Sequence, residues 1–283
     1  MATAARGAPL TEFPVADPMT SMIRYSRHGF ALEEVFFDTT GHAPPRARVD
    51  LLRLTELDAP VPSTMTVPFS TRVIDLRASA EELFSSFQAN TRTKARRATR
   101  DGILTRARGV ADLPAFLSFY SDFARRKQLH AANEVKLAAL ARAGLLLLTS
   151  AERPDGTPLA WHAYITTPTR ARQLYSATLA AEPSAAADRQ AIGRSHRLLQ
   201  WFDITYSKQL GLMELDLGGW CPGGTDAALM RINDFKQEFG GTVVQRFTCW
   251  RGLSLKGRCA VSLLKVAGAI RSRTSESSNR ETK

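Results

Sequence analysis

The sequence predicts an α+β fold in which helices flank one mixed, mostly antiparallel central sheet. Across residues 71–250, strand-like alternation and helical periodicity follow one another in the order β-α-β-α-α-β-β-β-α-β-α-β. The middle strands are separated by short turns, as in antiparallel hairpins, whereas the last strands are joined through helices. The chain has 283 residues, of which 44% are hydrophobic, so it can bury a sizeable core.

The first seventy residues give the weakest pattern. Residues 1–20 are rich in alanine and proline and are expected to be flexible. Residues 23–38 and 46–57 have the composition of short strands or irregular structure. The prolines that follow, the last of them Pro68, are expected to form a semi-rigid connection.

A clear pattern begins with a strand predicted over residues 71–76. Ser79 and Glu82 have the spacing of a capping box, which opens a helix or helix pair that ends at Gly102. The predicted buried face of this helical segment consists of Phe84, Phe87, Thr91, Ala95 and Ala98.

The middle of the chain alternates helices and strands. After a strand over residues 103–107, Asp112 and Asn133 are expected to cap two helices. Three strands are then predicted over 145–151, 159–166 and 173–179. A loop of small residues leads into a long helix over 188–209, with an apolar stripe formed by Ile192, Leu199, Phe202 and Tyr206.

Residues 213–242 are the stretch around which the chain is organised. A strand over 213–217 is expected to enter a glycine- and proline-rich turn over 218–224 and then a helix that Gly240 and Gly241 end. Ligands often bind where a strand passes through such a bend into a helix. A last strand over 242–250 and a peripheral helix within 251–270 complete the expected elements.

Composition narrows the classes of function. The net charge of +11 makes acidic partners plausible, although a basic surface is often only a solvated one. Three cysteines without a CxxC pair, and five histidines without an HxxxH or HExxH pair, predict no disulfide scaffold and no metal site. We find no secretory signal pattern and no apolar run long enough for a membrane span, so a cytoplasmic protein is expected.

Three motifs carry a resemblance to a known family. Residues 71–103 fit a strand, a helix and a basic segment of the form N-x-R-x-x-x-R-x-A-x-x-x-G-I/V, residues 215–220 read LDLGGW, and residues 235–240 read FKQEFG. In this order they resemble the GNAT acyltransferase superfamily, and within it the Fem-type (FemABX) peptidyltransferases of peptidoglycan bridges. The resemblance implies a GNAT-like sheet in a single GNAT domain.

The resemblance also suggests a domain division. Residues 71–250 would be the GNAT/FemAB-like acyltransferase domain, and residues 21–70 an N-terminal extension or the remnant of a first GNAT half. Residues 251–283 would be a C-terminal helix and a disordered basic tail. Fem proteins carry two GNAT-like domains, so the missing half puts a muropeptide substrate in doubt.

Two candidate sites follow from the resemblance. It implies that Lys236 stabilises charge near the acyl donor, whereas the alternative is a surface lysine. GNAT proteins bind the acyl-CoA pyrophosphate at a helix N-terminus through Q/R-x-x-G-x-G/A. The nearest match is Gln190, Gly193, Arg194 and Ser195, for which the alternative is an ordinary helix start.

Further catalytic candidates come from the residues themselves. Asp216 could accept an amine proton or orient the substrate, or it could cap the turn that follows it. His162 could be a base that faces the cleft, although a strand histidine is more often structural. Tyr206 could protonate a leaving thiolate, but its place in an apolar stripe favours core packing. The basic helix face with Arg92, Arg96, Arg97 and Arg100 could bind phosphates or be a solvated surface.

We therefore expect an N-acyltransferase that moves an acyl or aminoacyl group to an amine, with no metal. The candidate donors are acyl-CoA and aminoacyl-tRNA, and the candidate acceptors are small-molecule or cell-envelope-precursor amines in peptidoglycan or polysaccharide metabolism. tRNA is a candidate partner and DNA is not. A peripheral membrane contact is left open, without a segment that supports it. The alternative function is a catalytically silent GNAT-like scaffold that binds RNA or other polyanions.

Overall fold

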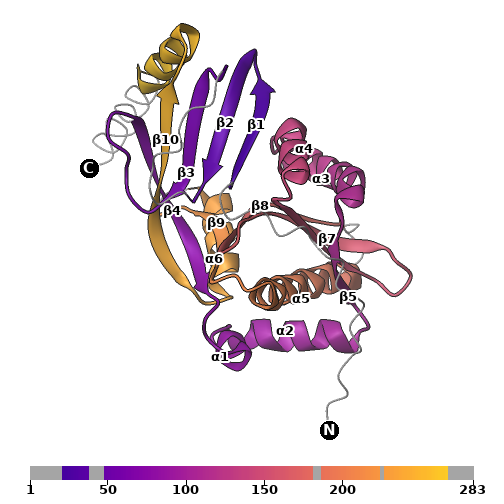
Figure 1. Cartoon of the computed structure of the whole chain (residues 1–283). Coiled ribbons are helices and arrows are strands. Elements are labelled where there is room, and N and C mark those ends of the chain that lie inside the picture. The colour runs from indigo at the N-terminus through magenta and orange to yellow at the C-terminus, as the bar shows by residue number, and fades with distance from the viewer. Residues whose placement is uncertain (1–20, 38–47, 181–185, 224–225, 267–283) are drawn as a thin grey trace, which may run out of the picture.

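A single ten-stranded sheet runs through the part of the chain that the computed structural model describes, residues 21–37, 48–180, 186–223 and 226–266 (Figure 1). The strand order is β1-β2-β3-β10-β4-β9-β8-β7-β6-β5. Neighbouring strands are antiparallel except for the parallel pairs β2–β3 and β8–β9. The predicted α+β class, with a mixed and mostly antiparallel sheet flanked by helices, is confirmed.

The elements follow the predicted order from β4 onward. The strands are β1 Met22–Arg27, β2 Phe30–Phe36, β3 Leu51–Leu57, β4 Met65–Asp75, β5 Leu104–Arg108, β6 Leu146–Glu152, β7 Pro158–Thr166, β8 Arg170–Thr178, β9 Glu214–Trp220 and β10 Thr242–Gly252. The helices are α1 Ala80–Ser85, α2 Ala89–Arg100, the short 3-10 helix η1 Val110–Asp112, α3 Leu113–Lys127, α4 Glu134–Arg142, α5 Ala186–Gln209 and α6 Ala227–Gln237. A further helix covers residues 255–266.

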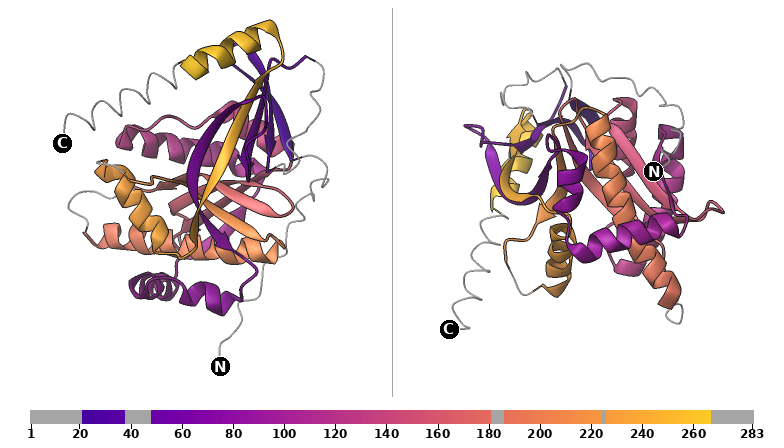
Figure 2. Two further views of the ribbon diagram at one scale, coloured as in Figure 1. Left: turned by 90° about the vertical axis from the view of Figure 1, so that its left-hand side faces the viewer. Right: turned by 90° about the horizontal axis from the view of Figure 1, so that it is seen from below.

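Helices cover both faces of the sheet (Figures 1 and 2). On one face, α3 and α4 pack on the strands in a core that includes Phe116, Leu146 and Leu148. On the other face, α5 and the α1–α2 segment enclose a core that includes Leu147 and Leu215. Successive residues of β6 thus point to opposite cores, as the two-residue period of a strand requires.

Local sequence signals explain the predicted helix ends. The Ser79 Oγ accepts a hydrogen bond from the Glu82 backbone N–H, and the Glu82 side chain accepts one from the Ser79 N–H, so the predicted capping box is confirmed. Asn133 caps α4 through a bond from the Lys136 N–H. Asp112 precedes α3, but its carboxylate accepts from the Gly109 N–H and makes no cap bond to α3.

The N-terminal strands belong to the same sheet. β3 pairs with β10, and β10 pairs with β4, so β1, β2 and β3 extend the sheet that carries the later motifs. Pro68 does not lie in a connection, because β4 begins at Met65 and Pro68 pairs with Phe247 of β10. β9 joins the other edge of β4 only from Ser70 onward, so the missing proline N–H leaves no partner unsatisfied.

The glycine bend after β9 begins later than predicted. β9 extends to Trp220 and includes two of the glycines that we assigned to a turn. Gly218 has φ +83°, and the register with β4 shifts between Thr71 and Val73 opposite this point, which indicates a β-bulge.

Residues 1–20, most of the C-terminal tail and part of the small-residue loop lie outside the described residues, as does Gly224. No helix of the described ranges is long and apolar enough to cross a membrane.

Candidate active site

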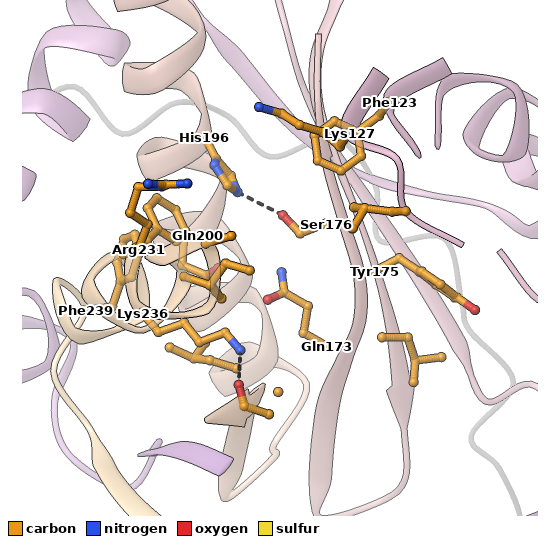
Figure 3. Close-up of a pocket in the computed structure, with 18 of the residues that line it drawn as sticks. Phe123, Lys127, Gln173, Tyr175, Ser176, His196, Gln200, Arg231, Lys236 and Phe239 are labelled. Carbon is orange, nitrogen blue, oxygen red and sulfur yellow. Dashed lines mark hydrogen bonds between the residues drawn. The ribbon is translucent and has the colours of Figure 1, made fainter. Parts of the chain in front are cut away.

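Two strands part at the centre of the sheet and open a pocket. β8 and β9 are parallel and pair only from Arg170 opposite Glu214 to Arg172 opposite Asp216. Beyond this point both strands continue but separate. A pocket of about 740 Å³ lies between their diverging ends and is closed by α3, α5 and α6 (Figure 3). The strand end singled out from the sequence therefore borders this pocket.

The pocket combines apolar walls with cations. Its apolar lining includes Phe123, Leu174, Leu217, Ile232, Phe235 and Phe239. The cations at its surface are Lys127, Arg172, Arg231 and Lys236, and none of the lining residues is acidic. Such a surface suits a ligand that has an anionic group and an apolar portion.

The packing of α6 and the residues after it explains why the FKxxFG segment has phenylalanine and glycine at these positions. The Phe235 ring stacks on His196 with centroids 4.4 Å apart, and the Phe239 ring packs edge-on against Phe87 at 5.2 Å. These contacts fix the helix so that Lys236 lies at the pocket. Gly240 follows with φ +74°, and a Cβ there would lie 2.6 Å from the Ser86 Oγ, so only glycine fits.

Lys236 points toward the end of β9. Its Nζ donates a hydrogen bond of 2.6 Å to the carbonyl oxygen of Gly219 (Figure 3). Burial lowers the pKa of Lys236 from 10.5 to about 8, and the Asp216 carboxylate opposes part of this shift. The ammonium group is thus a hydrogen-bond donor at neutral pH that sits in a partly desolvated place.

Asp216 is buried beneath the glycine bend. Its Oδ1 accepts hydrogen bonds from the Gly218 N–H at 2.6 Å and from the Thr71 hydroxyl. These contacts correspond to the turn-capping alternative for Asp216. Its Oδ2 has no hydrogen-bond partner in the described structure and lies 3.8 Å from the Nε of Arg172. A role in accepting an amine proton stays a prediction.

Arg172 connects the pocket to the N-terminal strands. It forms an ion pair with Glu56 at the end of β3 and stacks over Phe69, 5.3 Å from the ring centroid. Glu56 is almost fully buried, with φ +64°. Burial raises the pKa of Glu56 from 4.5 to about 7, with the Arg172 guanidinium opposing the shift and the Asp216 carboxylate adding to it. The strands before residue 58 therefore supply a charged group that holds a pocket residue.

The histidine at the pocket is His196, not His162. His196 is on α5, and its Nε2 lies 3.0 Å from the Ser176 Oγ of β8 (Figure 3). Burial lowers the pKa of His196 well below 6.5, and His162 and Arg197 lower it further. His196 is therefore a neutral imidazole at neutral pH.

His162 lies behind this ring and is fully buried. Its ring centroid is 5.0 Å from that of His196, and its Nδ1 is 2.6 Å from the Asp203 Oδ2. The Tyr164 hydroxyl donates to the same carboxylate oxygen at 2.7 Å and accepts from the pocket residue Gln173 at 3.2 Å. His162 does not line the pocket, because side chains of α5 cover it, and its position corresponds to the structural alternative.

Tyr206 takes no part in the pocket. It is buried on α5 and stacks on Phe202 with centroids 5.4 Å apart. Burial raises the pKa of its hydroxyl. This position corresponds to the core-packing alternative that its apolar stripe favoured, and Tyr206 is not among the residues that line the pocket.

The GNAT-like phosphate motif is not at a helix start. α5 begins at Ala186, so Gln190, Gly193, Arg194 and Ser195 lie in its second and third turns. The free N–H groups of a helix belong to its first four residues, here 186–189. Arg194 forms an ion pair with Asp101 at 2.9 Å, and the Ser195 hydroxyl donates to the Ile192 carbonyl. Cofactor binding by this segment remains a prediction, but these four residues do not have the free backbone N–H groups of a helix N-terminus on which that prediction was based.

The four arginines of α2 lie away from the pocket and do not line it. Arg92 donates to the backbone carbonyls of Ser85 and Phe87, Arg96 lies over the Phe84 ring, and Arg97 pairs with Asp101. Arg96, Arg97 and Arg100 are exposed. Binding of phosphates by this face stays a prediction.

Sequence reasoning missed the groups that tertiary contacts bring together. Ser176 and His196 belong to segments that we predicted only as strand and helix, and Arg172 lies just before a predicted strand. The only local signal was the Phe235 position of the FKxxFG motif, which contacts His196. Among the described residues, no cluster of three or more His, Cys, Asp or Glu could hold a metal ion.

Comparison with known proteins identifies the fold. No protein-family model matches the sequence, and no curated protein matches it. The structure of FemX is similar, with a TM-score of 0.54 and 13% identity, over 64% of this chain and 61% of the FemX chain. The chain thus spans about three fifths of FemX, and this likeness shows a Fem-like GNAT fold.

Two further structures have lower scores. L-PGS from Bacillus licheniformis has a TM-score of 0.47 and 12% identity over 75% of this chain and 72% of its own. N-myristoyltransferase from Saccharomyces cerevisiae, solved with bound myristoyl-CoA, has a TM-score of 0.36 and 12% identity over 82% of this chain and 62% of its own.

Proposed function

We propose that the chain is an N-acyltransferase that moves an acyl or aminoacyl group to an amine in the pocket between β8 and β9. The observation that carries this proposal is the parting of these strands after Arg172 and Asp216, with Lys236 at the opening. A pocket at such a point can receive a donor from one side and an acceptor from the other. The Fem-like fold supports the same class of reaction by analogy.

Lys236 acts as the electrophilic group. In the reaction the amine nitrogen attacks the acyl carbonyl carbon, a C–N bond forms, and the oxygen gains negative charge. The Lys236 ammonium, which now donates to the Gly219 carbonyl at 2.6 Å, transfers its hydrogen bond to that oxygen. Because its pKa is about 8, the group is charged at neutral pH and loses this function as pH rises above that value.

His196 accepts the proton that the attacking amine loses. Its imidazole is neutral because burial lowers its pKa, and it borders the pocket beside Ser176. When the C–S or C–O bond to the donor breaks, the leaving thiolate or alkoxide takes up that proton, so no covalent enzyme intermediate is needed. His162 and Asp203 stand behind His196 and fix its surroundings.

We favour acyl-CoA as the donor, with the rim cations Lys127 and Arg231 as contacts for its phosphates. Aminoacyl-tRNA is the other donor class, and its phosphates suit the same cations. An acceptor from peptidoglycan or another envelope precursor belongs to this proposal only through the likeness to FemX.

Thermal melting with coenzyme A, acetyl-CoA, uncharged tRNA and charged tRNA tests the proposal. We expect coenzyme A and acetyl-CoA to raise the melting temperature. Ala228→Trp should abolish the rise because Ala228 lines the pocket, whereas Leu229→Trp should keep it because Leu229 points elsewhere on the same helix. A rise with charged tRNA alone would identify an aminoacyl donor. No rise with any of the four would contradict the proposal.

The scaffold alternative makes a different prediction. It requires RNA binding that weakens steeply with salt and survives Lys236→Ala and Asp216→Ala. Most of the arginines that would bind RNA already contact their own chain. Negligible RNA affinity at moderate salt would remove this alternative.

A further inference from the structure

The last helix of the described chain turns an apolar face outward. In the helix over residues 255–266, Leu255 is 80% exposed, Leu263 71% and Val266 59%, and Cys259 is exposed as well. At about 100° per residue these four positions fall within an arc of about 80°. A helix of a soluble domain normally turns such a stripe inward, so within the residues that the structure describes this face has no partner.

The outward orientation is fixed by contacts on the opposite side of the helix. Val261 is buried in the core beneath α3 and α4. A Cβ at Gly257 would lie 2.0 Å from the Asp50 carbonyl oxygen, so glycine allows the helix to lie directly on the chain before β3. Ser254 donates to Asp50 at 2.6 Å, and Lys256 pairs with the same carboxylate at 2.8 Å. The helix stands at the end of β10, at the margin of the molecule (Figures 1 and 2).

Cations border the apolar stripe. Arg258 and Lys265 are seven residues apart, so they lie on one flank of the helix, and both are exposed. Neither side chain forms an ion pair or hydrogen bond within the described residues. The sequence contains no acidic residue between Glu238 and Glu276, and in that interval it has seven Arg or Lys residues, which are Arg246, Arg251, Lys256, Arg258, Lys265, Arg271 and Arg273.

We propose that this face docks on an anionic membrane surface. Leu255, Leu263 and Val266 enter the boundary between headgroups and acyl chains, while Arg258 and Lys265 bind lipid phosphates. A second copy of the chain fits less well. Pairing of this helix with itself would bring two cationic flanks together without acidic partners, whereas an anionic lipid surface complements the charge. The proposal does not depend on the proposed catalytic function.

Vesicle co-sedimentation tests the proposal. The full chain should bind phosphatidylcholine vesicles that contain about one third phosphatidylglycerol at least about tenfold more tightly than pure phosphatidylcholine vesicles. The double variant Leu255→Ser/Leu263→Ser should weaken that binding at least about tenfold. The matched variant Val110→Ser/Leu210→Ser removes two other exposed apolar side chains and should bind as the wild type does.

Three results would overturn the proposal. The wild type could fail to bind the anionic vesicles at low salt. The Leu255→Ser/Leu263→Ser variant, with its fold verified by circular dichroism, could bind as well as the wild type, which would mean that net charge alone attracts the protein. Sedimentation velocity could show a dimer that this variant converts to monomer without any vesicle binding, which would assign the face to a second copy.

Discussion

Replacing Lys236 by methionine should make the protein more stable at neutral pH, although it removes the proposed catalytic group. The Lys236 ammonium lies against the pocket wall, where burial lowers its pKa from 10.5 to about 8. A lowered lysine pKa means that the folded state disfavours the charge. Methionine has a similar length and carries no charge, so it relieves this cost.

The magnitude follows from the pKa. Below pH 8 the lysine is protonated in both states, and the shift corresponds to about 3 kcal/mol of destabilisation. Partial exposure to solvent and the lost hydrogen bond to Gly219 reduce the expected gain to about 1–2 kcal/mol. Between pH 8 and 10.5 the unfolded state binds more protons, so wild-type stability rises with pH and the gain of the variant disappears.

Urea denaturation at pH 7 and near pH 10 measures this effect. Lys127→Met is the matched control, because Lys127 is exposed at the rim of the same pocket and its replacement should change the free energy of unfolding by less than about 0.5 kcal/mol. If Lys236→Met is as stable as the wild type or less stable at pH 7, burial does not disfavour the ammonium and our electrostatic description of the site is wrong.

Three other perturbations have expected outcomes. Gly241→Ala should lower the free energy of unfolding by more than about 2 kcal/mol, because its Cβ would lie 2.4 Å from the Val73 carbonyl oxygen. The control Gly29→Ala, with a similar φ but open space around its Cβ, should cost about 1 kcal/mol, and urea titrations that show equal losses would refute the steric argument. Because the Glu56 carboxylate binds a proton more tightly in the folded state than in the unfolded state, the free energy of unfolding of the wild type should fall as pH rises from about 4.5 to about 7. Calorimetry should show that Glu56→Gln removes about 2–3 kcal/mol of this fall, and an unchanged pH dependence would contradict the raised pKa of Glu56. Phe239→Ala should cost about 3–5 kcal/mol by thermal melting, and a loss below about 1 kcal/mol would show that Phe239 does not anchor α6.

Much of the fold could be predicted because its signals are local. The capping box of α1, the Asn133 cap of α4 and the glycines after α6 are each set by neighbouring residues, and each appears in the structure. The error at β9 arose because a glycine-rich stretch can continue a strand through a bulge when a partner strand pairs with it. Pro68 was misplaced for a related reason, since one edge of β4 is free at that point.

The site was predicted less completely because it depends on contacts between distant segments. Lys236 was found through its motif, and the neighbouring Phe235 fixes it near His196. Glu56 and Arg172 are more than a hundred residues apart, and no periodicity could pair them. His162 was the only histidine considered from the sequence, and the packing of α5 on the sheet shows that His196 borders the pocket instead.

The most direct test of the central claim is the transfer of a labelled acyl group to a panel of amines from whichever donor raises the melting temperature. We predict turnover by the wild type, a loss of about 10²–10³-fold in Lys236→Met, and a change of less than about threefold in Lys94→Met, whose lysine lies on α2 and does not line the pocket. Equal turnover by the wild type and Lys236→Met would contradict the role of Lys236. Donor binding without transfer to any amine would contradict the assignment of the pocket as an acyltransferase site.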